Sequence, residues 1–316
     1  MSLTVMDNVS IVSVFTLSGL NVPANSKALL FALTALCYCV IWLLNMTIIV
    51  TIIVDKRLHE PMYIFLCNLC INGLYGTAGF YPKLLKDLLS SAHVISYVGC
   101  LLQGFVLHSS VCAELSLLLL MAFDRYVAIC QPLIYNSVMT KEKVAIFLTF
   151  AWLIPLYLVL VGTITTSVLK LCGSHIPKLY CINFLIGQLA CTPSVANIII
   201  PAMNYTVYLL HFTLIFFSYV YLIKKCLYSS ENRSKFMQTC LPHVVCLSTF
   251  ITAVAFDLLY VRFGQLDLPL AVKNFMAMEF LLVPPIINPL VYGLQLTQIR
   301  QRIVNSLLRR QMIWSH

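Results

Sequence analysis

The stretch that decides the fold is MAFDRYVAIC, residues 121–130, in which a long apolar run meets an adjacent acid and base. An arginine at membrane depth is costly unless it is paired or reaches water. Asp124 and Arg125 therefore mark a membrane boundary and form a candidate switch. Roughly 30 residues precede them without a basic residue, which exceeds the ~20 that a helix needs to cross a bilayer.

The composition is that of a membrane protein. Hydrophobic residues make up 60% of the 316 residues, charged residues 10%, and the mean hydropathy is +0.92. A soluble domain does not need so many apolar residues for its core. The net charge of +9 could suggest nucleic acid, but no basic arm interleaved with aromatic residues is present, so we expect no nucleic-acid partner and membrane lipids as the surroundings.

Long apolar runs separated by charges and prolines predict an all-α, seven-transmembrane helix bundle. Several runs contain no charged residue, and Pro155 and the prolines at 284, 285 and 289 predict kinks. The approximate spans are 29–54, 62–82, 94–123, 144–169, 196–223, 236–260 and 271–296.

The distribution of lysine and arginine predicts the orientation. Twelve lie in the first, third and fifth connections and the tail, seven lie on the opposite side, and Arg125 stands at the boundary. The richer side is expected to be cytoplasmic. Residues 1–28 are then extracellular, and 297–316 form a cytoplasmic tail whose alternating basic and apolar residues suit a short amphipathic helix on the membrane surface.

The predicted topology assigns a side of the membrane to each sequon and to four of the cysteines. Of four N-glycosylation sequons, only the one at Asn8 falls in an extracellular segment. Cysteines 172, 181 and 191 lie between the fourth and fifth spans, and Cys100 lies at the outer start of the third. All four are therefore expected on the oxidising side, where disulfides persist, and counting alone leaves three pairings open.

Several short motifs occur in order along the seven spans. They are Pro61-Met-Tyr63, MAFDRYVAIC, Ser218-Tyr219, KFMQTCLPH at 235–243 and PPIINPLVY at 284–292. Each motif alone is weak, but their order and spacing resemble the vertebrate olfactory receptors of the rhodopsin-like, class A G protein-coupled receptors, from Asn8 to the tail.

The resemblance implies a function and a set of residues. It implies a receptor in the plasma membrane of olfactory cilia that binds a small odorant and activates a stimulatory G protein, raising cyclic AMP. It implies disulfides Cys100–Cys181 and Cys172–Cys191. Arg125, held by Asp124 at rest, would swing to meet the G protein. The implied switch residues are Asp124, Arg125, Tyr126, Tyr219, Cys240, His243, Asn288, Pro289 and Tyr292.

The chain departs from the usual rhodopsin-like pattern at two places. Asn72 stands where an aspartate is usual, so a sodium site built on that acid is in doubt; Glu114 either replaces it or is a protonated acid hydrogen-bonded to a neighbouring helix. The sixth span has Phe250-Ile251-Thr252 in place of the aromatic pair common in olfactory receptors.

Helical spacing from Arg125 points to a ligand pocket in the outer half of the bundle. The candidate ligand-binding residues are His108, Val111, Cys112, Asn204, Val254, Ala255, Leu258 and Arg262. Arg262 would pair with an anionic group, as in related receptors for small acids, so the odorant would carry a carboxylate. Alternatively, Arg262 reaches solvent or pairs with Asp257 or Asp267, and His108 is a hydrogen-bonded buried histidine.

Other functions are less well supported. No nucleophile, base and orienting group come together, and no metal-spaced histidines or glycine-rich loop occur, so we expect neither an enzyme nor a cofactor. A transporter would use intramembrane acids such as Glu114, Asp257 and Glu279, but it predicts internal repeats that the sequence lacks. A class A receptor for a hormone, small acid, lipid or peptide is the other alternative.

Overall fold

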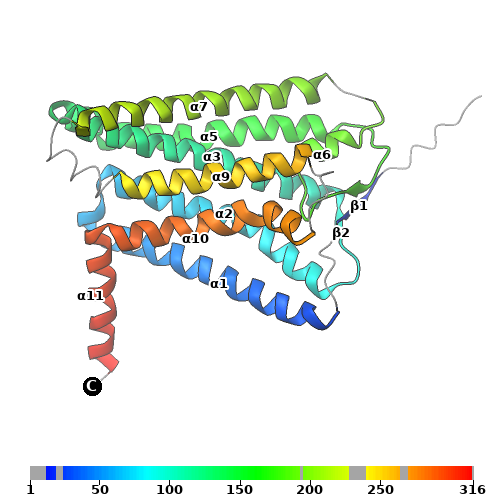
Figure 1. The fold of residues 1–316 in the computed structure, drawn as a ribbon, viewed down its shortest axis with the longest axis horizontal. Coiled ribbons are helices and arrows are strands. Elements are labelled where there is room, and N and C mark those ends of the chain that lie inside the picture. The colour runs from blue at the N-terminus through cyan, green and yellow to red at the C-terminus, as the bar shows by residue number, and fades with distance from the viewer. Residues whose placement is uncertain (1–11, 19–23, 193–194, 228–239, 264–269, 315–316) are drawn as a thin grey trace, which may run out of the picture.

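The computed structural model describes residues 12–18, 24–192, 195–227, 240–263 and 270–314. Within these residues, seven helices of 23 to 34 residues run side by side (Figure 1). They are α1 (Ala24–Val54), α2 (Pro61–Leu89), α3 (Tyr97–Cys130), α5 (Lys141–Ser167), α7 (Ala196–Leu227), α9 (Leu241–Phe263) and α10 (Leu270–Gln295).

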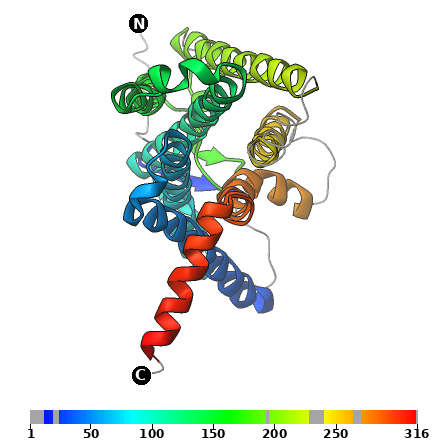
Figure 2. The same ribbon diagram turned by 90° about the vertical axis from the view of Figure 1, so that its left-hand side faces the viewer.

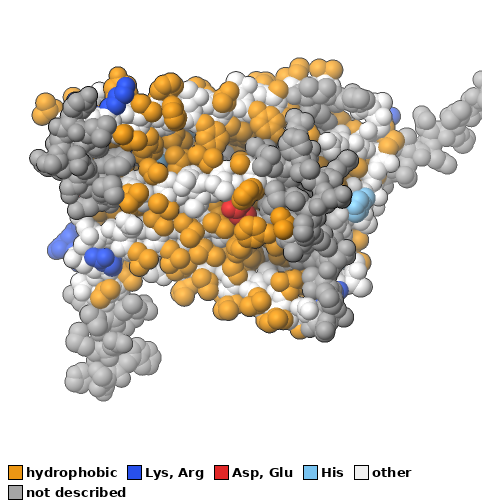
Figure 3. Space-filling view, viewed as in Figure 1, with side chains coloured by type: hydrophobic (Ala, Val, Ile, Leu, Met, Phe, Trp, Pro, Cys, Tyr) orange, Lys and Arg blue, Asp and Glu red, His pale blue; other side chains and the backbone are white. Residues whose placement is uncertain are grey.

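The length and composition of these helices suit a membrane. Four are long and apolar enough to span a bilayer, namely Ser26–Val54, Tyr97–Cys130, Lys141–Ser167 and Ile199–Lys225, and the bent pair Met278–Gln295 with Thr297–Asn305 would make a fifth. The two others, α2 and α9, pack into the same bundle, α2 against α1 and α3 and α9 against α10. Hydrophobic side chains cover much of the visible flank of the bundle (Figure 3).

Local sequence explains where several helices begin. Pro61 occupies the first turn of α2, where its missing N–H is not needed. The Ser96 hydroxyl accepts a hydrogen bond from Gly99 N at 3.2 Å and caps α3, and Thr140 accepts one from Lys143 N at 3.4 Å and caps α5.

Some helix ends differ from the expected spans. Residues 94–96 form a strand, so α3 begins at Tyr97, and the helix continues through Asp124 and Arg125 to Cys130. The acid–base pair therefore lies inside the last turns of α3. Helix α2 extends to Leu89, and its last turns carry an ion pair between Lys83 and Asp87, which are four residues apart on the helix.

Helix α11 (Thr297–Trp314) follows α10 after a bend of 89° and lies across the end of the bundle (Figures 1 and 2). Ile299 on its first turns is fully buried, and Arg302 Nε forms an ion pair of 2.6 Å with Asp55 Oδ2 at the end of α1. The helix expected in the tail is therefore present and attached to the bundle.

A small sheet at the opposite end was not predicted from the sequence. Strand β1 (Val14–Leu17) lies between β2 (Val94–Ser96), to which it is antiparallel, and β3 (His175–Ile176), to which it is parallel. Phe15 of β1 is fully buried and packs with Cys100 and Cys181. The sheet therefore ties the N-terminal segment to the connection between α5 and α7.

Both implied disulfides are present in the structure. Cys100 pairs with Cys181, with Cα atoms 5.3 Å apart, and Cys172 pairs with Cys191 at 4.9 Å. The remaining short helices are η1 (Lys56–Leu58), η2 (Pro132–Ile134), α4 (Tyr135–Val138) and α6 (Asn183–Gln188).

Candidate functional site

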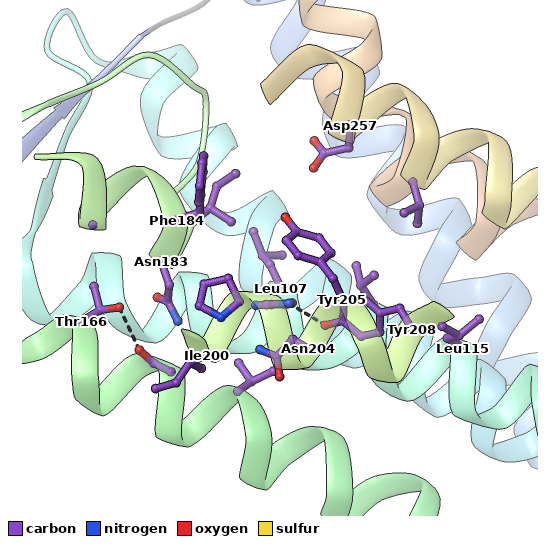
Figure 4. A pocket seen from close by; sticks show the side chains of 18 of the residues that line it. Leu107, Leu115, Thr166, Asn183, Phe184, Ile200, Asn204, Tyr205, Tyr208 and Asp257 are labelled. Atoms are coloured by element: carbon purple, nitrogen blue, oxygen red, sulfur yellow. Dashed lines mark hydrogen bonds between the residues drawn. The ribbon is translucent and has the colours of Figure 1, made fainter. Parts of the chain in front are cut away.

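A cavity of about 530 Å³ opens in the half of the bundle next to the sheet (Figure 4). Its walls come from α3, α5, α7, α9 and α10, and the connection between α5 and α7, including α6, closes it. Apolar and aromatic side chains predominate, and the polar lining residues include His108, Asn183, Asn204, Tyr205, Tyr208 and Asp257.

The closing connection is fixed at several points. The Cys100–Cys181 disulfide joins it to α3, and Gln103 Oε1 of α3 accepts a hydrogen bond from Cys181 N at 3.0 Å. Asn183 Nδ2 donates to Thr163 Oγ1 of α5 at 2.8 Å. A Cβ atom at Gly104 would lie 3.0 Å from Asn183 Oδ1, so glycine allows this close approach to α3.

Four of the predicted ligand-binding residues line this cavity: His108, Val111, Asn204 and Val254. His108 Nε2 and Tyr208 Oη form a hydrogen bond of 2.7 Å across the wall, which fits the alternative of a hydrogen-bonded histidine, although the ring is half-buried because it lines the cavity. Because a ligand can still contact the ring, a role in binding is compatible with this bond.

The other predicted pocket residues lie elsewhere. Cys112 is buried behind Tyr208, and its Sγ lies 2.6 Å from Tyr208 Oη. Ala255 is exposed on the outer surface of α9 and does not line the cavity, because one residue step turns a helix by about 100° away from Val254. The side chains of Leu258 and Arg262, and Asp267, lie outside the described residues.

An ion pair at one end of the cavity was not predicted from the sequence. Lys178, in the connection, pairs with Asp257 of α9, and Tyr180 Oη donates to Asp257 Oδ1 at 2.6 Å. Lys178 Nζ also donates to Tyr180 Oη at 2.6 Å. Burial lowers the pKa of the Lys178 ammonium, and the Asp257 charge counteracts that shift. No local pattern joins residues 79 positions apart, so the pair could not be found by periodicity.

A second polar group lies at the other end of α3. Arg125 forms an ion pair with Asp124, with Nε donating to Oδ2 at 2.9 Å, and the Asp124 carboxylate is fully buried. Tyr135 Oη of α4 donates to Asp124 Oδ1 at 2.8 Å. Burial, the Asp124 charge and their hydrogen bond raise the pKa of the Tyr135 phenol, which keeps it protonated as a donor.

Several other predicted switch residues lie in the same half of the bundle as this ion pair. Tyr219 Oη of α7 and His243 Nδ1 of α9 are hydrogen-bonded, and their rings stack with centroids 5.5 Å apart. Tyr219, Cys240 and Tyr292 are buried in the same apolar cluster. Tyr126 contacts Tyr221 edge to face at 6.2 Å.

Glu114 and Asn288 meet between the cavity and the ion pair. Asn288 Nδ2 of α10 donates to Glu114 Oε1 of α3 at 3.0 Å, and both side chains are buried. Asn72 donates instead to the backbone oxygen of Ser110 at 3.0 Å. Glu114 thus links α3 to α10 next to Pro289, which fits the alternative of an interhelical hydrogen bond. No cluster of metal-ligating side chains occurs within the part of the chain that the structure describes.

Comparison with known proteins identifies the family. A sequence model described as "Olfactory receptor" matches residues 34–310. The chain belongs to the olfactory receptor family. It is similar to human olfactory receptor 52D1 (34% identity, 86% of this chain and 88% of that one) and mouse olfactory receptor 4E2 (35%, 90% and 92%). It is also similar to human olfactory receptor 10G4 (33%, 95% and 96%).

Family membership defines the class of protein. The chain is a seven-transmembrane, rhodopsin-like receptor and not an enzyme. Members of this family in general respond to small odorants and couple to G proteins, and the apolar helices fit a multi-pass membrane protein. The receptor therefore has two candidate functional regions, the cavity and the Asp124–Arg125 ion pair, at opposite ends of α3.

Proposed function

We propose that the receptor binds a small odorant in the cavity and activates a stimulatory, olfactory-type G protein that raises cyclic AMP. The main observation that supports this proposal is the cavity. Its volume of about 530 Å³ lies within the roughly 300–1,000 Å³ of small-molecule sites, and a few polar groups stand on mostly apolar walls.

Two helices connect the cavity to the proposed G-protein switch. Val111 of α3 lines the cavity, and Arg125 lies 14 residues along the same helix, or about 21 Å. On α9, Val254 lines the cavity and His243 bonds Tyr219. A ligand that contacts both helices would bind an inactive and an active arrangement of the bundle with different affinities. This difference in affinity shifts the equilibrium between the two arrangements.

The proposed location is the plasma membrane of olfactory cilia, with the N-terminus outside and the tail inside. The excess of lysine and arginine in the first, third and fifth connections and the tail supports this orientation. So do the two disulfides, which lie in the half of the molecule that would face the oxidising exterior. Glycosylation of Asn8, which lies outside the described residues, stays a prediction.

The preference for a carboxylate-bearing odorant also stays a prediction, because it depends on Arg262. Among the described lining residues there is no lysine or arginine, and the ionised side chain on the wall is Asp257. The described lining therefore suits an apolar ligand with one or two hydrogen-bonding groups.

Neighbouring residues on α9 provide a matched test of the binding site. Val254→Phe puts a ring into the cavity and should raise the odorant concentration for half-maximal cyclic AMP about tenfold or more, because overpacking costs about 1–3 kcal/mol. Ala255→Phe adds a ring on the exposed side of α9 and should leave potency unchanged at equal surface expression. Equal potency of the two variants would place the ligand elsewhere.

The proposed switch is tested separately at Arg125. Arg125→Ala should leave the cavity intact but abolish odorant-dependent cyclic AMP, measured against a direct activator of adenylyl cyclase as the control for the downstream machinery. It also removes the partner of a fully buried carboxylate, so surface expression is measured alongside. A surface-expressed Arg125→Ala receptor with full odorant response would contradict the proposed coupling.

A further inference from the structure

The two residues of the ion pair between the closing connection and α9, Lys178 and Asp257, differ in their exposure to the cavity. The Lys178 side chain is completely buried, whereas the Asp257 side chain keeps 22% of its surface exposed and lines the cavity. In Figure 4 the Asp257 carboxylate points from α9 toward the space enclosed by the labelled residues. A molecule in the cavity therefore meets the acid of this pair and not the ammonium.

The protein itself holds Asp257 in this position. Lys178 Nζ and Tyr180 Oη both reach the same oxygen, Oδ1, from the connection. An ionised carboxylate is an acceptor with about four lone-pair sites on two oxygens, so it can take further donors. The Tyr180 hydroxyl hydrogen is already directed at Asp257.

The charges favour one kind of polar group. Lys178 compensates the charge of Asp257, so a ligand cation would gain little there and would approach a buried ammonium. A carboxylate would face another carboxylate without an intervening donor, which is repulsive in a site with few polar groups. A neutral hydroxyl or N–H can donate to Asp257 without either cost.

We infer that Asp257 is a specificity-determining residue that selects odorants with a neutral hydrogen-bond donor, such as alcohols, over carboxylic acids. The inference rests on the proposed function, because it concerns the ligand class of the same cavity. It differs from the expectation based on Arg262, which favours acids. The two therefore predict opposite orders of potency.

The first experiment uses the unmodified receptor and sets of three matched odorants. Each set contains a primary alcohol, its methyl ether and the carboxylic acid with the same number of carbons, over several chain lengths, with cyclic AMP as the readout. The alcohol should be at least about tenfold more potent than the ether, which lacks the donor, and than the acid. An acid or ether at least as potent as the alcohol would overturn the inference. A surface-expressed receptor silent to every set counts against the proposed odorant function instead.

The second experiment exchanges the pair. Lys178→Asp combined with Asp257→Lys keeps an ion pair but places the cation on the cavity wall, so the acid should become more potent than the alcohol. The matched control exchanges Lys83 and Asp87, an ion pair at the end of α2 whose residues do not line the cavity, and should keep the original order.

A second variant, in which both residues of the pair are replaced by neutral amides, is tested in case the exchanged receptor does not reach the cell surface. Lys178→Gln with Asp257→Asn removes both charges together, so no buried ammonium is left unpaired. Asparagine can donate as well as accept, and the preference for the alcohol over the acid should fall about tenfold or more. An unchanged preference in either surface-expressed variant would overturn the inference.

Discussion

Asp124 is held from two sides, and only one of them is visible in the sequence. Arg125 is its neighbour, so an acid–base pair at the end of an apolar run predicts the contact directly. Tyr135 follows after a turn and lies in a four-residue helix, and its bond to Asp124 depends on how the chain folds back after Cys130. The Lys178–Asp257 pair was not predicted for the same reason, because it too depends on how distant segments fold together. Helical periodicity relates only residues on the same helix, so it does not predict such contacts.

Tyr135 should act as a restraint on the switch. Tyr135→Phe leaves one oxygen of a fully buried carboxylate without its donor, which costs about 1–3 kcal/mol and weakens the arrangement in which Asp124 holds Arg125. We expect basal cyclic AMP, normalised to surface expression, to rise about fivefold. Tyr157→Phe makes the same chemical change at a 66% exposed position on α5 and should leave basal activity unchanged. Equal basal activity in the two variants would show that Tyr135 does not restrain the switch.

Helices and strands differ in how far the sequence predicts them. The helices of the bundle follow from apolar runs of about 20 residues or more that contain at most two charged residues, a pattern that is typical of membrane-spanning helices. The three strands are two to four residues long, too short for a detectable alternation, and β1 depends on partners far along the chain. The position of Arg125 before the end of α3 was also missed, because a charged pair can lie inside the last turns of a helix as well as at its end.

The two disulfides should contribute unequally. Cys100–Cys181 closes a separation of 81 residues and joins the connection to α3, whereas Cys172–Cys191 closes 19 residues within the connection. Chain-entropy estimates are about 4.5 and about 3 kcal/mol. Cys100→Ser with Cys181→Ser should therefore reduce surface expression and thermal stability more than Cys172→Ser with Cys191→Ser. Cys39→Ser, at an exposed free cysteine of α1, should have no effect. A larger loss of surface expression and thermal stability in the Cys172/Cys191 variant would show that the shorter disulfide contributes more to the stability of the fold.

The whole molecule has two different ends, and its orientation in the membrane can be tested directly. The sheet and both disulfides lie at one end, and the Asp124–Arg125 pair and α11 at the other. An epitope tag before Met1 should be labelled on intact cells, and a tag after His316 only after permeabilisation. Labelling of the C-terminal tag on intact cells would contradict the proposed orientation.

The same orientation predicts which sequon is used. Asn8→Gln should remove a mobility shift produced by an N-glycosidase, because Asn8 precedes the first helix on the expected outer side. Asn232→Gln, in the connection between the fifth and sixth spans, should leave the shift unchanged. A shift that disappears only in the Asn232 variant would reverse the assignment.

The central position of β1 in the sheet has a consequence for biosynthesis. In the parallel pairing of β1 with β3, His175 follows its partner Thr16 by 159 residues, so a ribosome adding about 5–20 residues per second needs on the order of ten to thirty seconds to synthesise the chain between them. During that interval β1 lacks one of its two neighbouring strands while the intervening helices are inserted. Folding of this receptor should therefore be sensitive to pauses in translation and to chaperones that bind the nascent N-terminal segment.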